Sequence, residues 1–146
     1  MTTQQTRLLG IDYGTKRIGL SLSDPLRITA QPFETVANDS KLWNRLREII
    51  HQQEVEFVVV GMPLNLKGEQ AMKAREVESF IQRLKLEIGC KVVAWDERFT
   101  SSIAQESMLR MGTKKKDRRQ KGRIDSMAAA IMLQGFLDST KVSLSC

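Results

Sequence analysis

Cysteine and histidine are scarce in this sequence, and that scarcity excludes several kinds of site. The 146 residues include two cysteines and one histidine. Cys90 and Cys146 form neither a disulfide framework nor a Cys-x-x-Cys metal motif, so we expect two free thiols without a function. His51 lies in a helical stretch away from every motif described below. A lone histidine in that position excludes a Ser-His catalytic triad and a histidine-based ribonuclease mechanism.

Long hydrophobic runs and aromatic residues are also missing. The longest apolar runs, such as FVVVGM, are far shorter than the roughly 20 residues that a membrane span needs. The first seven residues are polar and contain no signal-peptide pattern, so we expect a cytoplasmic protein without a membrane partner. Aromatic residues make up 5% of the chain, and Trp43 and Trp95 occupy core-like positions. Base stacking is therefore not expected to be the main source of any nucleic-acid affinity.

A basic excess is present instead, and it is concentrated toward the C-terminus. The formal net charge is +6. Residues 1–110 contain 15 basic and 14 acidic side chains, whereas residues 111–146 contain eight basic and three acidic ones. Such a cluster is typical of a surface that binds nucleic acid, although a solvated loop is the commoner explanation. With 41% hydrophobic residues, the chain is expected to form a single domain spanning residues 1–146.

The hydrophobic pattern predicts an α/β fold. Short runs of branched apolar residues predict strands, and apolar residues three or four positions apart predict helices. The expected strands span residues 7–12, 17–23, 28–36, 57–63 and 91–97. The expected helices span residues 41–50, 69–88, 102–111 and 124–137. A three-strand antiparallel meander followed by two crossover strands gives a mixed five-stranded sheet with helices on both faces.

Three local features refine this prediction. Pro32 cannot donate a ladder hydrogen bond, so the third strand should lie at an edge or contain a bulge. Residues from about 112 to 123, which include TKKKDRRQKGR, have no periodicity and are expected to form a mobile basic loop. The small residues Ala128, Ala129 and Ala130 would let the last helix lie close to the sheet.

Three acidic residues lie at the ends of predicted core elements. Asp12 ends the first strand, Glu97 ends the last strand, and Asp125 begins the last helix. The first strand should be central with the last strand on its parallel side, so the three carboxylates can converge. Converging carboxylates repel one another unless a divalent cation binds them. Taken one at a time, the same acids are explained as a turn residue, a surface acid and a helix-start acid.

Four blocks of sequence carry a family resemblance over nearly the whole chain. In order, they are GIDYGTKRIGLSLSD, VVVGMPLNLKG, DERFTS and RIDSMAAAIMLQGFL. Together they resemble the YqgF family of RNase H-like proteins, also called Holliday-junction-resolvase-like proteins or pre-16S rRNA nucleases. The resemblance implies an RNase H-like fold, which agrees with the element order predicted above.

The resemblance also implies an activity and a site. The expected protein is a metal-dependent nuclease that trims the 5′ end of precursor 16S rRNA during bacterial ribosome biogenesis. Its expected partner is precursor rRNA, including rRNA in pre-ribosomal particles. The family's acidic residues correspond to Asp12, Glu97 and Asp125. These carboxylates would bind two Mg²⁺ or Mn²⁺ ions, one activating the attacking water and the other stabilising the leaving oxygen.

Candidate nucleic-acid contacts surround these acids. Lys16 and Arg17 either bind phosphates beside the cut or are ordinary turn charges. Asn65 follows a buried strand, where ligands commonly meet such sheets, and loop turn chemistry explains it nearly as well. A basic run leads directly into Asp125 and would give salt-dependent binding without sequence preference. Its members are Lys114, Lys115, Lys116, Arg118, Arg119, Lys121 and Arg123.

Three other functions fit parts of the sequence. A structure-selective DNA endonuclease acting on four-way junctions would use the same fold and acids, and sequence cannot separate it from an RNA nuclease. A catalytically weak nucleic-acid-binding module would keep the fold and the basic run, but the presence of all three acids argues against it. An ATP-binding protein of the actin and Hsp70 superfamily would need two lobes, for which 146 residues are too few.

Overall fold

A mixed five-stranded sheet runs through the molecule, and the computed structural model describes residues 6–62, 69–96 and 118–144. The strands are β1 (Arg7–Asp12), β2 (Arg17–Ser23), β3 (Ala30–Ala37), β4 (Val55–Met62) and β5 (Lys91–Asp96). The described helices are α1 (Leu42–Gln52), α2 (Glu69–Ile88) and α4 (Arg118–Leu144). All five predicted strands are therefore confirmed, with ends that differ by at most two residues.

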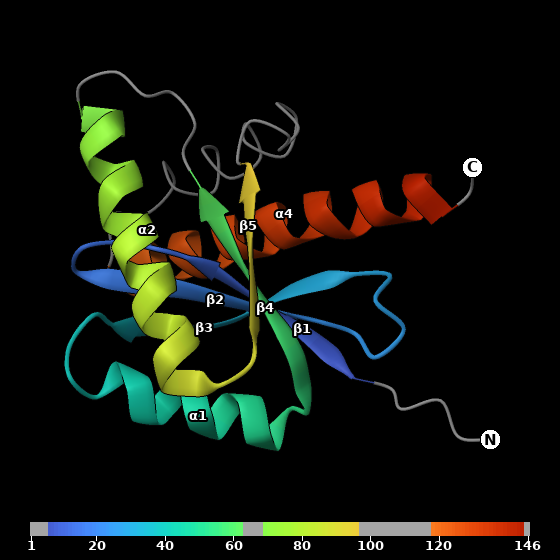
Figure 1. Ribbon diagram of the computed structural model, residues 1–146, viewed down its shortest axis with the longest axis horizontal. Coiled ribbons are helices and arrows are strands. Elements are labelled where there is room, and N and C mark those ends of the chain that lie inside the picture. The colour runs from blue at the N-terminus through green and yellow to red at the C-terminus, as the bar shows by residue number, and fades with distance from the viewer. Residues whose placement is uncertain (1–5, 63–68, 97–117, 145–146) are drawn as a thin grey trace.

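The strand order is β3-β2-β1-β4-β5, which places β1 at the centre, as the sequence predicted (Figure 1). The first three strands are antiparallel neighbours, and β4 and β5 add to the sheet in parallel. Parallel pairing requires crossover connections, and helices α1 and α2 belong to these connections. The last residue of β1, Asp12, therefore lies at the same end of the sheet as the C-terminal ends of β4 and β5. This end, where β1, β4 and β5 finish, is called "this edge of the sheet" below.

Strand β3 lies at the edge of the sheet and contains the irregularity that its proline predicted. Leu20 of β2 pairs with Glu34, but the next residue, Ser21, pairs with Pro32. Phe33 is thus left over between two paired positions, which is the pattern of a β-bulge. Both predictions for this strand are confirmed, because an edge strand and a bulge each tolerate a residue without a backbone N–H.

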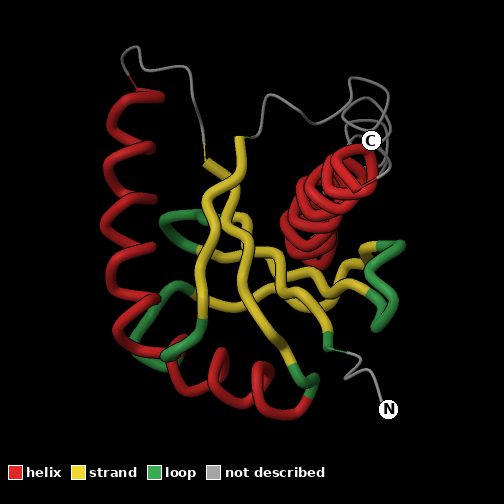
Figure 2. The backbone as a smooth tube through the Cα atoms, turned by 45° about the vertical axis from the view of Figure 1, so that its right-hand side comes forward, coloured by secondary structure: helices red, strands yellow, loops and turns green. Residues whose placement is uncertain are grey.

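Helices cover both faces of the sheet (Figure 2). Each face carries its own apolar cluster. The alternation of side chains along β1 sends Leu9 and Ile11 to the face covered by α1 and α2. Leu8 points to the other face, where it packs with Leu133 and Leu137 of α4. Helix α4 therefore covers the face of β1 that also carries residues 10 and 12.

Helix α4 is longer than the hydrophobic pattern predicts. It begins at Arg118, so residues 118–123 are helical and the expectation of a loop there is wrong. The helix also continues past Leu137 to Leu144. Arginine, lysine and glutamine have high helix propensity, and extending a formed helix is far easier than nucleating a new one. Gly122 costs about 1 kcal/mol relative to alanine, which does not stop that extension.

Two predicted segments lie outside the described residues: the helix at 102–111 and the part of the basic loop before residue 118. Within the described part of the chain, no helix is both long enough and apolar enough to cross a membrane.

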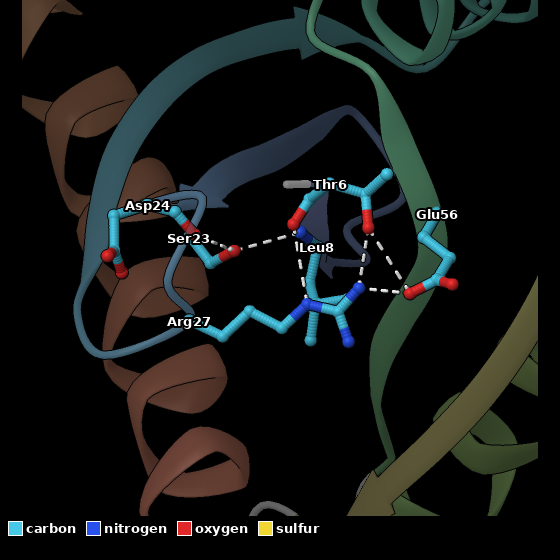
Figure 3. A network of polar contacts seen from close by, with 6 residues as sticks. All are labelled: Thr6, Leu8, Ser23, Asp24, Arg27 and Glu56. Atoms are coloured by element: carbon cyan, nitrogen blue, oxygen red, sulfur yellow. Dashed lines mark hydrogen bonds and ion pairs between the residues drawn. The ribbon is translucent and has the colours of Figure 1, made fainter. Parts of the chain in front are cut away.

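Arg27 ties the starts of β1 and β4 together at the end of the sheet opposite to Asp12 (Figure 3). Its guanidinium donates to the hydroxyl of Thr6 at 2.6 Å and to the backbone carbonyl of Thr6 at 3.3 Å. It also forms an ion pair with Glu56. The backbone of Arg27 has a φ of 59°, a left-handed conformation that is uncommon for a residue with a side chain.

Asp24 holds the loop that carries this arginine. Its carboxylate accepts hydrogen bonds from the backbone N–H groups of Leu26, Ile28 and Thr29 at 3.1, 2.7 and 2.8 Å. Desolvation raises the pKa of Asp24, but these backbone donors outweigh it and leave the pKa below its ordinary value. The ionised form is thus the one that stabilises the loop.

We predict that Asp24→Ala lowers the free energy of unfolding by about 1–2 kcal/mol at neutral pH, because several backbone donors lose a charged acceptor. Because the pKa of Asp24 is lowered in the folded state, its ionised carboxylate stabilises the protein fully above the ordinary aspartate pKa of about 3.9. This stabilisation is lost as the pH falls through the folded-state pKa. Urea unfolding at several pH values should show the difference between the two proteins narrowing in acid. Asp24→Asn keeps an oxygen acceptor and should lose less. A difference that is constant with pH would contradict this assignment.

Candidate functional site

Asp12 is the last residue of β1 and is partly buried on the face covered by α4. The face of the sheet to which Asp12 points follows from Gly10 and Leu8, two and four positions before it in the strand. Leu8 packs with α4, and a Cβ added at Gly10 would lie 3.0 Å from Leu133 and 3.2 Å from the carbonyl oxygen of Ala129. Because side chains alternate along a strand, Asp12 points to that same side of the sheet.

Gly19 brings Asp125 to the strand next to Asp12. In the β1–β2 ladder, Gly19 is the residue paired with Asp12. A Cβ added at Gly19 would lie only 2.0 Å from the backbone oxygen of Asp125 and 2.3 Å from its carbonyl carbon. The backbone of α4 therefore rests directly on β2 at this point, with no side chain between them. As a result, two of the three predicted acids lie on the same face and one strand apart.

Small residues on both elements make this approach possible along the length of the contact. A Cβ at Gly10 would lie 3.0–3.2 Å from atoms of α4, and one at Gly19 would lie 2.0–3.0 Å from the helix backbone. On the helix, Ala129 and Ala130 are buried and Ala128 is partly buried. The prediction that these alanines let the helix lie close to the sheet is confirmed.

Arg17 forms an ion pair with Asp125, in which its Nε donates to Oδ2 at 2.8 Å. Arg17 is the first residue of β2, two positions before Gly19 and on the same face of the strand. The side chains of Arg17 and Asp125 remain 44% and 26% exposed, so water can reach both charges. The sequence identified both residues as site candidates but gave no sign that they pair with each other.

The turn between β1 and β2 is held in a defined shape. A Cβ added at Gly14 would lie 2.2 Å from the carbonyl oxygen of Arg17, so the turn closes only with glycine there. Asn38, which follows β3, donates from its side-chain amide to Gly14 at 2.9 Å and from its backbone N–H to Lys16 at 3.0 Å. Asn38 was missed in the sequence, where it resembles an ordinary turn residue. Lys16 is exposed in this turn, where its ammonium can reach solvent or a ligand.

The donor atoms at this edge have the right chemistry for Mg²⁺ or Mn²⁺, since both ions prefer carboxylate oxygens. Asp12 and Asp125 supply two such groups. Within residues 6–62, 69–96 and 118–144, no three His, Cys, Asp or Glu side chains form a group that could hold a metal ion. The third predicted acid, Glu97, lies outside the described residues and directly follows the last residue of β5.

The structure describes part of the predicted nucleic-acid contacts. Asn65 and residues 114–116 lie outside the described residues. Four members of the basic run lie in the first turns of α4, directly before Asp125, namely Arg118, Arg119, Lys121 and Arg123. His51 is exposed on α1, as expected for a surface helix residue.

Comparison with known sequences identifies relatives over nearly the whole chain. A family model described as RuvX, a Holliday junction resolvase, matches residues 6–139. A curated relative from Sulfurihydrogenibium sp., named "Putative pre-16S rRNA nuclease", is 41% identical over 140 residues, which is 94% of each chain. A relative of the same name from Desulforamulus reducens is 44% identical and covers 91% of this chain and 97% of its own.

Comparison with solved structures identifies the fold. RuvC of T. thermophilus in complex with a Holliday junction substrate matches with a TM-score of 0.57 at 20% identity, covering 93% of this chain and 96% of RuvC. The fowlpox virus resolvase with Holliday junction DNA matches with a TM-score of 0.55 at 10% identity, covering 92% and 99%. The expected RNase H-like fold is thereby confirmed.

We predict that Gly19→Ala lowers the free energy of unfolding by about 1–3 kcal/mol, because the new methyl group overlaps a backbone oxygen that moves only if α4 moves. Chemical denaturation measures this loss. The control is Gly89→Asn, since an added Cβ there meets nothing within 4 Å and asparagine tolerates its φ of 66°. Equal stability of Gly19→Ala and the wild type would contradict the direct contact between α4 and β2.

Proposed function

Since the chain belongs to the RuvX family of Holliday junction resolvases, we propose that it is a nuclease that processes precursor 16S rRNA in the cytoplasm. The name of its curated relatives supports the substrate. The observation that carries the proposal is the contact at Gly19, which brings Asp125 to the strand beside Asp12. Two carboxylates held on one face of the sheet are the groups that a phosphodiesterase site requires.

Asp12, Asp125 and Glu97 are the residues proposed to hold the metal ions. Two Mg²⁺ or Mn²⁺ ions, when bound, would supply an activated water and stabilise the leaving oxygen of the phosphodiester. The contribution of the chain is to fix the carboxylates in place. Asp12 is fixed by its position in the central strand, and Asp125 by the close packing of α4 on β2.

Arg17 has two partners available at this site. Its ion pair with Asp125 is open to solvent, and exposed pairs of this kind contribute only about 0–1 kcal/mol. Exchanging the carboxylate for a substrate phosphate therefore costs little, and a guanidinium can bind phosphate oxygens through two parallel hydrogen bonds. We propose that Arg17 neutralises Asp125 in the free protein and binds a phosphate beside the cut when substrate is present.

The remaining candidates are proposed to bind the nucleic-acid backbone. Lys16 projects from the turn that follows Asp12, and Asn65 follows β4 in sequence. The basic residues 114–123 precede Asp125, and those from 118 onward belong to α4. Binding through these groups should weaken steeply with salt.

A four-way DNA junction is the second candidate substrate. The family description names Holliday junction resolvases, and both structural neighbours described above were solved with junction DNA. Contacts to phosphates do not distinguish RNA from DNA, because they carry no information about the 2′-hydroxyl. The relatives that are 41% and 44% identical carry the rRNA nuclease name, which favours RNA.

We predict that Asp12→Asn, Asp125→Asn and Glu97→Gln each lower the cleavage rate by at least about a hundredfold, since each removes a carboxylate from a site worth several kcal/mol of transition-state stabilisation. The rates are measured on end-labelled precursor RNA, single-stranded DNA and a four-way junction, with Mg²⁺, Mn²⁺ or EDTA. Asp138→Asn is the control, because it changes an exposed aspartate on the same helix.

Cleavage that survives EDTA or Asp12→Asn would refute the metal-dependent nuclease. Cleavage restricted to the junction would transfer the substrate assignment to DNA. Binding of every substrate without cleavage would leave a nucleic-acid-binding module.

A further inference from the structure

Two neighbouring clefts lie on the side of the sheet opposite to α4, against helix α2. Each has a volume of about 410 Å³, within the range of about 300–1,000 Å³ typical of small-ligand pockets. One cleft lies between α2, α1 and the residue that follows β3, and the other lies between α2 and the β1–β2 turn. They share Tyr13 and Glu76, so they adjoin each other.

Aromatic rings line the first of these clefts. The ring of Tyr13 lies 4.9 Å from that of Phe80, and the ring of Phe80 stacks on Trp43 at 5.6 Å. Phe80 and Trp43 are buried, whereas Tyr13 is only partly buried and offers ring surface to the clefts. Sequence composition argued against stacking because aromatic residues are few, but the fold gathers three of them at one place.

Basic side chains surround the clefts. Lys73 and Arg75 are exposed on α2 and each lines one cleft, and no ion pair involves either of them among the described residues. Other arginines on this side of the molecule are neutralised, as Arg45 is by Glu34 and Arg47 is by Glu87. Unpaired positive charge at the clefts is therefore available to an anionic ligand.

The clefts lie beside the proposed catalytic site, because Tyr13 lines both of them and is the neighbour of Asp12 in the chain. Tyr13 directly follows Asp12, and consecutive Cα atoms are about 3.8 Å apart. Asp12 points to the α4 face, whereas Tyr13 packs against the cluster on the other face. A strand of nucleic acid that crosses this edge of the sheet can place one phosphate at Asp12 and a neighbouring nucleotide in the clefts.

We propose that the two clefts bind an unpaired nucleotide of a single-stranded nucleic acid next to the bond that is cut, an inference that rests on the proposed nuclease function. The base packs against Tyr13, and its phosphates bind Lys73 and Arg75. Glu76, at the junction of the clefts, offers an acceptor to the amino group of a base and keeps phosphates on the basic side. Bases in a duplex are stacked and paired, so they cannot enter the clefts.

The test is the affinity of the full chain for a fluorescently labelled single-stranded RNA, measured by anisotropy in EDTA so that no cleavage occurs. Lys73→Gln/Arg75→Gln should weaken binding about tenfold or more and reduce the salt slope by about 1.4, since each lost phosphate contact on a single strand contributes about 0.7. The affinity for a duplex of the same sequence should change by less than about twofold. Single-stranded DNA of the same sequence shows whether the 2′-hydroxyl contributes.

The matched control is Lys41→Gln/Lys85→Gln, which removes the same charge from exposed positions on α1's start and on α2 but outside the clefts. Stacking is tested separately: Tyr13→Leu should weaken single-strand binding about tenfold, and Tyr13→Phe should not. Circular dichroism and denaturation of each variant show that it is folded.

Several outcomes would overturn the proposal. These are an equal loss in the control pair, an equal loss on duplex and single strand, and an unchanged affinity. A loss that accompanies a change from dimer to monomer in sedimentation would assign the clefts to a second copy of the chain and also overturn it. The binding measurements need neither metal nor cleavage, so they test the clefts separately from the nuclease assignment. That assignment fails on a different result, which is cleavage by the Asp12→Asn variant.

Discussion

The contact between the backbone of α4 and Gly19 is the constraint on which the candidate site depends. A helix normally lies on a sheet with side chains between them, yet here a Cβ at residue 19 would be 2.0 Å from the backbone oxygen of Asp125. Close packing of the helix backbone on the sheet requires small side chains, and Gly10 and Gly19 on the strands and alanines on the helix provide them. None of these residues has a reactive side chain. They place Asp125, which is 113 positions after Asp12 in sequence, against β2, the strand that pairs with Asp12.

Charge balance is the second constraint on this edge of the sheet. Gathering carboxylates costs free energy unless cations compensate them, and the described chain supplies Arg17 for Asp125. That pair is exposed enough to be exchanged at low cost, so the same arginine can stabilise the free protein and later contact a phosphate. On the other face, Tyr13 and the unpaired charges of α2 continue the surface beyond the acids. The proposed path of a single-stranded nucleic acid therefore crosses from one face of the sheet to the other at residues 12 and 13.

Much of the fold was predictable from the sequence because it depends on local patterns. Branched apolar runs indicated all five strands, Pro32 indicated the edge and the bulge, and the alanines indicated close packing. The start of α4 was not predictable from hydrophobic periodicity, because its first turns are polar and are helical through propensity and extension. The pairing of Arg17 with Asp125, the hydrogen bonds of Asn38 and the aromatic lining of the clefts depend on tertiary contacts between distant segments. No local pattern encodes them.

If Asp12 and Asp125 belong to one metal-binding site, a single Mn²⁺ ion should contact both carboxylates. Crystals of the wild-type protein soaked in Mn²⁺, with diffraction recorded near the manganese absorption edge, reveal where the ion binds. We expect anomalous density in contact with both carboxylates and a guanidinium of Arg17 that has left Asp125. Density bound by only one of the two acids, or none at this edge of the sheet at Mn²⁺ concentrations that support cleavage, would contradict it.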